Sequence, residues 1–186
     1  MNGSLFLSPE QPQTDFSDID ALKKCLHELG LMSIRSTGRD TDSYLCGESF
    51  AQMITFMGCS PHLVFEPPAD GSDQYCHIRL HHFSEITLLT GQQTAPPRCP
   101  ACRFRISDWR NMADDWRSET PTSSWQCPNC KKKSAAYELD WRQSGGAGRV
   151  FIEIRNIFPG EAVPVDQLMA KLEEISGEKW RYFYLV

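Results

Sequence analysis

The chain has 186 residues, of which 40% are hydrophobic and 23% are charged, and its formal net charge is −5. This composition supports a packed core and excludes an intrinsically disordered chain. No apolar run is long enough to cross a bilayer as a helix, and the first residues lack the basic and apolar segments of a secretory signal. We therefore expect a cytoplasmic protein that does not enter a membrane and whose thiols stay reduced.

The N-terminal third predicts a tail followed by two helices. Residues 1–14 are rich in Ser, Pro and Gln, which is typical of a flexible tail. Apolar residues at helical spacing predict an amphipathic helix over residues 16–29, which Gly30 can end. The same pattern predicts a second helix over residues 50–57, and residues 61–65 predict a short strand.

Strands are predicted on both sides of a cysteine-rich segment in the middle of the chain. One covers residues 75–83, and two more, 135–143 and 149–158, are joined by the glycine-rich stretch 144–148. A strand follows these glycines where a phosphate-binding loop needs a helix, so they predict a hairpin turn. We expect these strands to belong to one sheet.

The C-terminal part predicts a helix and a final strand. An apolar stripe over residues 165–175 indicates the helix, Gly177 suits its end, and residues 181–186 indicate the strand. An aromatic strand at the edge of a sheet offers unpaired backbone groups, so homo-oligomer formation through this strand is an alternative that the sequence leaves open.

Four of the eight cysteines form two close pairs, Cys99-Pro-Ala-Cys102 and Cys127-Pro-Asn-Cys130. A two-residue gap lets one turn direct both sulfurs to a common ion. Two such turns complete a tetrahedral Zn²⁺ site with Zn–S bonds of about 2.3 Å. Four thiolates leave no coordinated water to activate, so the metal is expected to be structural. A thioredoxin-like redox dithiol is the alternative for a single pair, and the presence of two Pro-containing pairs disfavours it.

These CPxC-type pairs resemble those of zinc ribbons, in which two knuckles hold one zinc beneath a small antiparallel sheet. The resemblance covers residues 97–142 and implies a zinc-ribbon insertion in one domain made of residues 15–96 and 143–186. The chain departs from many ribbons at Arg103 and Lys131, which follow the knuckles where glycine is frequent. Rubredoxin-like iron sites use similar knuckles, so iron is the alternative metal. The expected fold is α+β, with a small mixed or antiparallel sheet, about three helices and this insertion.

The cysteine-rich segment is basic in an acidic chain. Residues 98–142 carry nine basic and six acidic side chains, against 10 basic and 18 acidic elsewhere. Four thiolates and one Zn²⁺ add a charge of about −2, which leaves the loaded segment near +1. Its aromatic residues can stack on unpaired bases, but we favour a role as apolar cover for a small module. The residues considered for partner or nucleic-acid contact are Arg103, Arg105, Trp109, Lys131, Lys132 and Lys133.

The remaining cysteines and histidines offer a weaker signal. A second metal site or an acid/base pair would use Cys76, His77 and His81. Positions four residues apart on a strand are separated by about 13 Å, too far to share one ion, so a polar solvent-exposed face is the favoured interpretation. The single cysteines, Cys76 included, are expected to be small buried residues.

Together these patterns predict a non-catalytic zinc-binding adaptor or regulatory protein that binds a protein partner through the ribbon or a sheet edge. No complete set of nucleophile, base and oxyanion donors is visible in the sequence. The first alternative is a protein that binds single-stranded RNA or DNA, and the second is a metalloenzyme with a second Cys/His site. The net charge of −5 favours a protein partner over nucleic acid.

Overall fold

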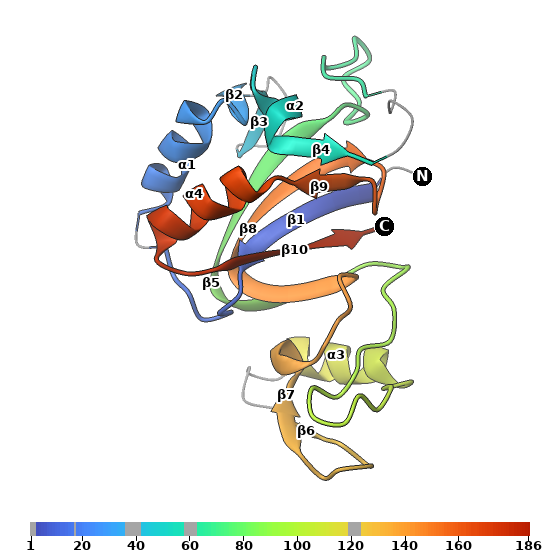
Figure 1. The fold of residues 1–186 in the computed structure, drawn as a ribbon. Helices are drawn as coiled ribbons and strands as arrows, with labels where there is room; N and C mark the ends of the chain where they lie inside the picture. Colours follow the sequence, from blue (N-terminus) through green and yellow to red (C-terminus); the bar gives the residue numbers. More distant parts are fainter. Residues whose placement is uncertain (1–2, 17, 36–41, 58–62, 119–123) are drawn as a thin grey trace.

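A computed structural model describes residues 3–16, 18–35, 42–57, 63–118 and 124–186. Over these residues the chain forms a mixed α/β structure with four α-helices and a curled antiparallel sheet (Figure 1). None of the described helices has the length and apolar character needed to span a membrane.

The main sheet has six strands in the order β10-β1-β8-β5-β3-β2, and every neighbouring pair is antiparallel. Strands that are distant in the sequence therefore lie side by side: β1, the first strand of the chain, lies between β8 and β10. The bounds of these strands are β1 Gly3–Pro9, β2 Met32–Arg35, β3 Ser43–Cys46, β5 His77–Thr90, β8 Gly145–Ile157 and β10 Trp180–Leu185.

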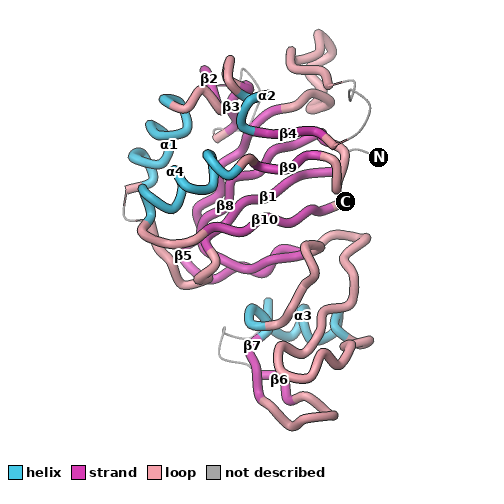
Figure 2. Tube along the Cα trace, viewed as in Figure 1, coloured by secondary structure: helices cyan, strands magenta, loops and turns pink. Residues whose placement is uncertain are grey.

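Strands β5 and β8 are much longer than the others and give the sheet its curl (Figure 2). Their pairing changes register between His82 and Thr87 and then continues to Thr90 opposite Gly145. An irregularity of this kind bends the strand and increases its twist. The far end of the pair therefore extends beyond the rest of the sheet and carries the cysteine-rich segment (Figure 1).

Helices α1 (Ile19–Glu28) and α4 (Asp166–Ser176) cover one face of the sheet. The carboxylate of Asp18 caps α1 by accepting a hydrogen bond from the N–H of Ala21 at 3.0 Å. Gly177 ends α4 with a φ of 70°, as the sequence predicted. The core between helices and sheet includes Leu5, Leu7, Leu22, Leu26, Ile78, Ile152, Ile154, Leu168 and Leu172.

The C-terminal strand lies at an edge of the sheet, as expected, because β10 pairs with β1 alone in the strand order. Part of its outer side is occupied within the chain, since the N–H of Tyr184 donates to the carbonyl of Gln143 at 2.9 Å. Self-association through this strand stays a prediction.

The predicted flexible tail, residues 1–14, is wrong for Gly3–Pro9, which form β1 in the middle of the sheet. Leu5 and Leu7 face the helices and are fully buried, while Phe6 packs on the opposite face. Successive side chains of a strand point to opposite faces, so only two or three of them reach the core from so short a strand. The apolar run is therefore too short to be recognised as a strand among the polar residues around it.

The predicted second helix over residues 50–57 is wrong beyond its first turn. Helix α2 covers only Phe50–Met53, and Ile54–Phe56 form strand β4, which pairs with β9 (Ala162–Pro164). A β-branched and aromatic run favours the extended conformation once a partner strand is available. Of the strand predicted over residues 61–65, the first two lie outside the described residues and the other three have no regular structure.

The predicted glycine-rich hairpin turn is also wrong, because β8 begins at Gly145 and the glycines pair with the end of β5. The glycines allow close packing: a Cβ on Gly146 would lie 2.4 Å from Cε1 of Phe183. The strand predicted over residues 135–143 is replaced by the end of β7 (Lys133–Ala135) and a 3₁₀ turn, Ala136–Glu138.

The cysteine-rich segment forms a separate lower part of the molecule in Figure 1. It contains helix α3 (Trp109–Ser118) and a two-stranded antiparallel sheet of β6 (Ser124–Gln126) and β7. Two residues of the long strands, Leu88 and Ala147, belong to its core and attach it to the main sheet. The buried members of this core are Leu88, Ile106, Trp109, Ala113, Trp116, Ala136, Leu139, Trp141 and Ala147.

Candidate metal centre

The four paired cysteines converge on one point of the lower part. Their Sγ atoms all lie within 4.8 Å of one another. Sulfur atoms of opposite pairs are closest, at 3.7 Å for Cys99 to Cys130 and 3.6 Å for Cys102 to Cys127. A tetrahedral ion with metal–sulfur bonds of about 2.3 Å requires sulfurs about 3.8 Å apart. The four thiols can therefore hold a metal ion with little movement.

Both cysteine pairs are built on the same backbone turn. In each, the first cysteine accepts one backbone hydrogen bond and donates another to the residues just after the pair. The repetition means that two segments 28 residues apart present their sulfurs in the same way. The bonds are Arg103 N to Cys99 O at 3.0 Å, Cys99 N to Phe104 O at 2.9 Å, Lys131 N to Cys127 O at 2.9 Å, and Cys127 N to Lys132 O at 2.9 Å.

The missing glycines after the knuckles do not alter these turns. Arg103 and Lys131 adopt the left-handed conformation that glycine often provides, with φ of 63° and 62°. Each side chain also has a partner: Arg103 forms an ion pair with Asp140 at 2.7 Å, and Lys131 donates to the carbonyl of Pro128 at 2.8 Å. A non-glycine residue in this conformation costs about 1 kcal/mol, which the chain tolerates at both positions.

The surroundings of Cys99 and Cys102 favour the thiolate, which is the form that binds metals. A hydrogen bond from the backbone of Cys102 is the main cause that lowers the pKa of the Cys99 thiol below its usual value. A hydrogen bond from the side chain of Asn129 is the main cause that lowers the pKa of Cys102 to about 6. At Cys130 a backbone hydrogen bond from Lys132 acts to lower the pKa, but burial and hydrogen bonds with the other cysteines outweigh it and raise the pKa to about 11. Cys99 and Cys127 are buried, whereas Cys130 is exposed.

The tryptophans of the segment form its apolar core. Trp109 and Trp141 pack edge to face with ring centroids 5.5 Å apart, and Trp116 packs against Tyr137. Trp109 is only 2% exposed, which agrees with the favoured role of apolar cover and leaves no exposed ring face for a partner or a nucleic-acid base, the other role considered for it. Its hydrophobic surface is needed inside a segment whose sheet has two strands of three residues each.

The charged residues predicted as contacts stay on the surface. Arg105 and all of Lys131–Lys133 are exposed, and Phe104 is 39% exposed beside them in the sequence. Arg103 is engaged by Asp140, so its charge is partly neutralised. The surface next to the sulfurs is therefore basic, with one exposed aromatic ring following the first knuckle.

The structure does not bring the residues of the predicted second site together. Cys76 is buried beside Cys46, and His77 bonds through Nδ1 to the carbonyl of Tyr75 at 2.8 Å. His81 contacts a different group, Glu153. Within the described ranges, the four paired cysteines are the one group of three or more His, Cys, Asp or Glu residues close enough to share an ion. Cys59, a further residue that the sequence offers for such a site, lies outside those ranges.

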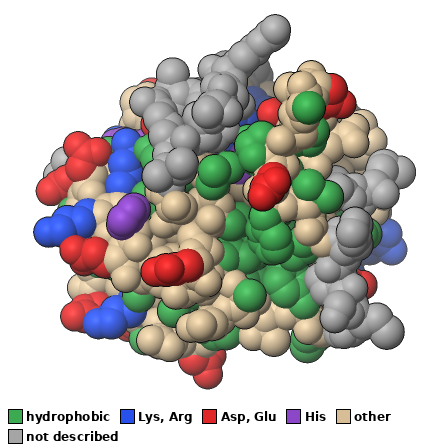
Figure 3. Space-filling view, turned by 90° about the horizontal axis from the view of Figure 1, so that it is seen from above, with side chains coloured by type: hydrophobic (Ala, Val, Ile, Leu, Met, Phe, Trp, Pro, Cys, Tyr) green, Lys and Arg blue, Asp and Glu red, His purple; other side chains and the backbone are tan. Residues whose placement is uncertain are grey.

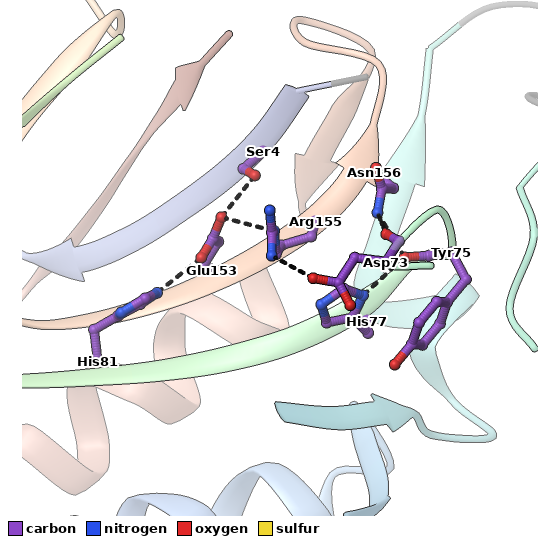
Figure 4. Close-up of polar contacts among 8 residues, drawn as sticks. All are labelled: Ser4, Asp73, Tyr75, His77, His81, Glu153, Arg155 and Asn156. Atoms are coloured by element: carbon purple, nitrogen blue, oxygen red, sulfur yellow. Dashed lines mark hydrogen bonds and ion pairs between the residues drawn. The ribbon is translucent and has the colours of Figure 1, made fainter. Parts of the chain in front are cut away.

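A buried polar cluster on the main sheet escaped the sequence analysis (Figure 4). The Glu153 carboxylate accepts a hydrogen bond from Ser4 Oγ and contacts His81 Nε2, both at 2.8 Å, and Arg155 Nε lies 3.4 Å away. Burial acts to raise the pKa of Glu153, but the hydrogen bonds from His81 and Ser4 outweigh it and hold the pKa below its usual value. Its sequence signal is a single Glu inside the apolar run of β8.

This cluster is not arranged as a hydrolase site. In a catalytic triad the serine donates to the histidine, and the carboxylate holds the other side of the ring. Here Ser4 donates directly to Glu153, which separates the hydroxyl from His81. The cluster therefore supplies hydrogen-bond partners to the buried carboxylate of Glu153 and joins β1, β8 and β5.

Comparisons with protein-family models, with curated proteins and with solved structures gave no match for this chain. The functional argument therefore depends on the chain's own residues, and the four-cysteine centre is the part that carries specific chemistry.

Proposed function

We propose that the protein is a non-catalytic binding protein of the cytoplasm in which residues 97–142 form a zinc ribbon around one structural Zn²⁺. The observation that carries the proposal is the pair of matching turns, which sets four sulfurs at nearly the spacing of a tetrahedral ion. Zinc imposes no geometric preference of its own and accepts four thiolates in this arrangement. Iron accepts the same ligands and is the alternative metal.

The metal supplies stability to the ribbon, whose own sheet is minimal. All four coordination positions are taken by protein sulfurs, which leaves no position for a substrate or an activated water. The Zn²⁺ ties together two turns that come from either side of α3, so one bound ion organises the entire segment. The functional surface is then the exterior of the ribbon, and the metal has no catalytic part in it.

The proposed ligand of that exterior is a protein. Phe104, the second residue after the first knuckle, is exposed, and Lys132 occupies the equivalent position after the second. An exposed aromatic ring with cations around it is typical of an anchor in a protein interface. We expect the partner to offer an apolar pocket with acidic residues at its rim, because the exposed charges next to Phe104 are basic.

Single-stranded nucleic acid is the second candidate, and three consecutive exposed lysines favour it. Binding of single strands also needs aromatic faces on which bases stack. Trp109, Trp116 and Trp141 are at most 5% exposed, so the segment offers few such faces. This loss of stacking surface is the reason for placing a protein partner first.

Metal analysis of the purified full-length chain tests the zinc centre. We expect one zinc per chain, and we expect the Cys127→Ser variant to lose it. Cys25→Ser is the matched control, because Cys25 is a half-buried cysteine on α1 that the proposal does not use. Iron in place of zinc, or zinc retained without Cys127, would contradict the proposal.

Affinity capture tests the partner. The wild-type chain and a Phe104→Ala, Lys132→Ala variant are compared as baits, with and without nuclease. A protein that is retained by the wild type after nuclease treatment and lost by the variant supports a protein partner. Retention of RNA or single-stranded DNA that falls steeply with added salt would instead support the nucleic-acid candidate.

A further inference from the structure

A second pair of thiols lies in the main sheet, away from the metal centre. The register of β3 and β5 places Ser43 opposite Arg79 and Leu45 opposite His77. The next opposite pair in this register is Cys46 and Cys76. Their Sγ atoms are 3.7 Å apart, and the Cys46 thiol also donates to the backbone carbonyl of Cys76 at 3.4 Å.

The surroundings of this pair differ from those of a metal site. Within the described ranges, no third Cys, His, Asp or Glu lies close enough to share an ion with Cys46 and Cys76. Cys76 is fully buried and its backbone N–H donates to the carbonyl of Val64, which fixes its position. Cys46 is half-buried, so it is the more accessible residue of the pair. Two thiols in contact, one fixed and one accessible, form a dithiol.

We propose that Cys46 and Cys76 form a reversible disulfide that links β3 to β5. With a hydroperoxide such as hydrogen peroxide as oxidant, the sulfur of Cys46 attacks an oxygen, the O–O bond breaks, and a sulfenic acid and one water result. The sulfur of Cys76 then displaces the hydroxyl group, the S–S bond forms, and a second water leaves. Two thiols lose two electrons and two protons to the peroxide. A small thiol such as glutathione reverses the reaction by thiol–disulfide exchange.

The geometry allows this bond with a small movement. Directly opposite residues of antiparallel strands have Cβ atoms about 4.5–5.5 Å apart, whereas a disulfide prefers about 3.8 Å. The two strands must therefore approach slightly, which makes the bond easier to reduce than a relaxed disulfide. The hydrogen bond to Cys76 and burial hold the pKa of the Cys46 thiol above its usual range, so the reaction is slow at neutral pH. The pair responds to sustained oxidation, and it is not a catalytic dithiol.

The bond would close a loop over residues 47–75. This loop carries α2, β4 and several of the most exposed apolar side chains of the described chain, among them Met57 at 63%, Val64 at 44% and Phe65 at 43%. Figure 3 views this end of the molecule and shows apolar side chains gathered on it. A covalent link at the base of the loop reduces the conformational freedom of the unfolded chain.

The test uses the full-length, zinc-loaded chain treated with increasing hydrogen peroxide, followed by alkylation and peptide mass mapping. We expect a peptide pair joined between Cys46 and Cys76, with the loss of two hydrogens, after prolonged exposure to the peroxide. Dithiothreitol should restore both thiols. The oxidised chain should also melt at a higher temperature, by several degrees, than the reduced chain.

Two variants make the test specific. Cys46→Ala removes the accessible thiol from a half-buried position and should give no linked peptide and no shift in melting temperature on oxidation. Cys25→Ser should behave as the wild type does. The proposal is overturned if Cys46 and Cys76 both remain free thiols after prolonged exposure to the peroxide, or if Cys46 links to a different cysteine. The metal content of the untreated chain tests the metal centre separately.

Discussion

The main sheet and the cysteine-rich segment stabilise β-structure by different means. The main sheet has six strands and buries a large apolar face under α1 and α4. Among the described residues, the segment has two strands of three residues and four thiols in contact, and its small core is completed by Leu88 and Ala147 of the main sheet. A sheet that small buries too little apolar surface to be stable alone. The comparison implies that removal of the metal affects one region and that removal of core volume affects the other.

Loss of the metal should have the largest effect and should be confined to the segment. In zinc-finger peptides the apparent binding free energy is about 10–16 kcal/mol, and it is also the folding free energy. Four of the five tryptophans lie in residues 97–142, whereas Trp180 packs in the main core. Chelation, or the Cys127→Ser substitution, should shift the tryptophan emission to longer wavelength while amide protection of β1 and β8 persists. Loss of that protection would contradict the separation of the two regions.

Truncation of a core side chain in the main sheet should destabilise that sheet and leave the metal centre of the segment unchanged. Ile152 is fully buried among the strands and helices of the main core, so Ile152→Ala should lower the free energy of unfolding by about 2–5 kcal/mol. Denaturant unfolding measures the change, and the zinc content should remain at that of the wild type. Met57→Ala is the control, because that side chain is 63% exposed and its loss should be nearly neutral.

Substitution of a glycine in β8 should lower the free energy of unfolding by less than the core truncation does. Gly146→Ala places a Cβ 2.4 Å from the ring of Phe183 and should lower the free energy of unfolding by about 1–3 kcal/mol. Gly148→Ala is the matched control, since its Cβ would meet Phe151 at an ordinary 3.5 Å. Equal unfolding midpoints for the two variants would show that Gly146 does not limit the packing.

The smallest expected effect is an increase in metal affinity at the four-cysteine centre. Lys131 has a φ of 62°, so Lys131→Gly relieves a backbone cost of about 1 kcal/mol and should tighten metal binding about fivefold. Lys132→Gly removes a neighbouring charge at a position without a positive φ and should not tighten binding. Competition with a chromophoric zinc chelator measures both affinities. A weaker affinity for Lys131→Gly would show that the lysine side chain matters more than the turn.

The features that the sequence predicted correctly are local. The two cysteine pairs carry their geometry within four residues each, so their convergence could be expected without knowledge of the rest of the fold. Helix α4 and strand β10 were also predicted, because the apolar stripe and Gly177 are neighbours in sequence. Local spacing was sufficient wherever the partners of a residue lie within one or two turns of it.

The features that were missed depend on distant partners. Gly3–Pro9 form a central strand only because β8 and β10 lie on either side of it. The polar cluster joins Ser4 to Glu153 across 149 residues, and no pattern in either segment indicates that contact. Cys46 and Cys76 are 30 residues apart and meet through the register of β3 and β5. Trp109 was also kept among the possible contact residues, because its burial depends on Trp141, which approaches it from the other end of the segment.

X-ray absorption at the zinc edge, measured on the purified full-length chain, tests the central claim most directly. The proposed centre predicts a zinc ion with four sulfur ligands at about 2.3 Å and no nitrogen or oxygen in the first coordination sphere. Zinc bound through nitrogen or oxygen, fewer than four sulfurs, or a chain that binds no zinc would contradict a structural ribbon built on Cys99, Cys102, Cys127 and Cys130.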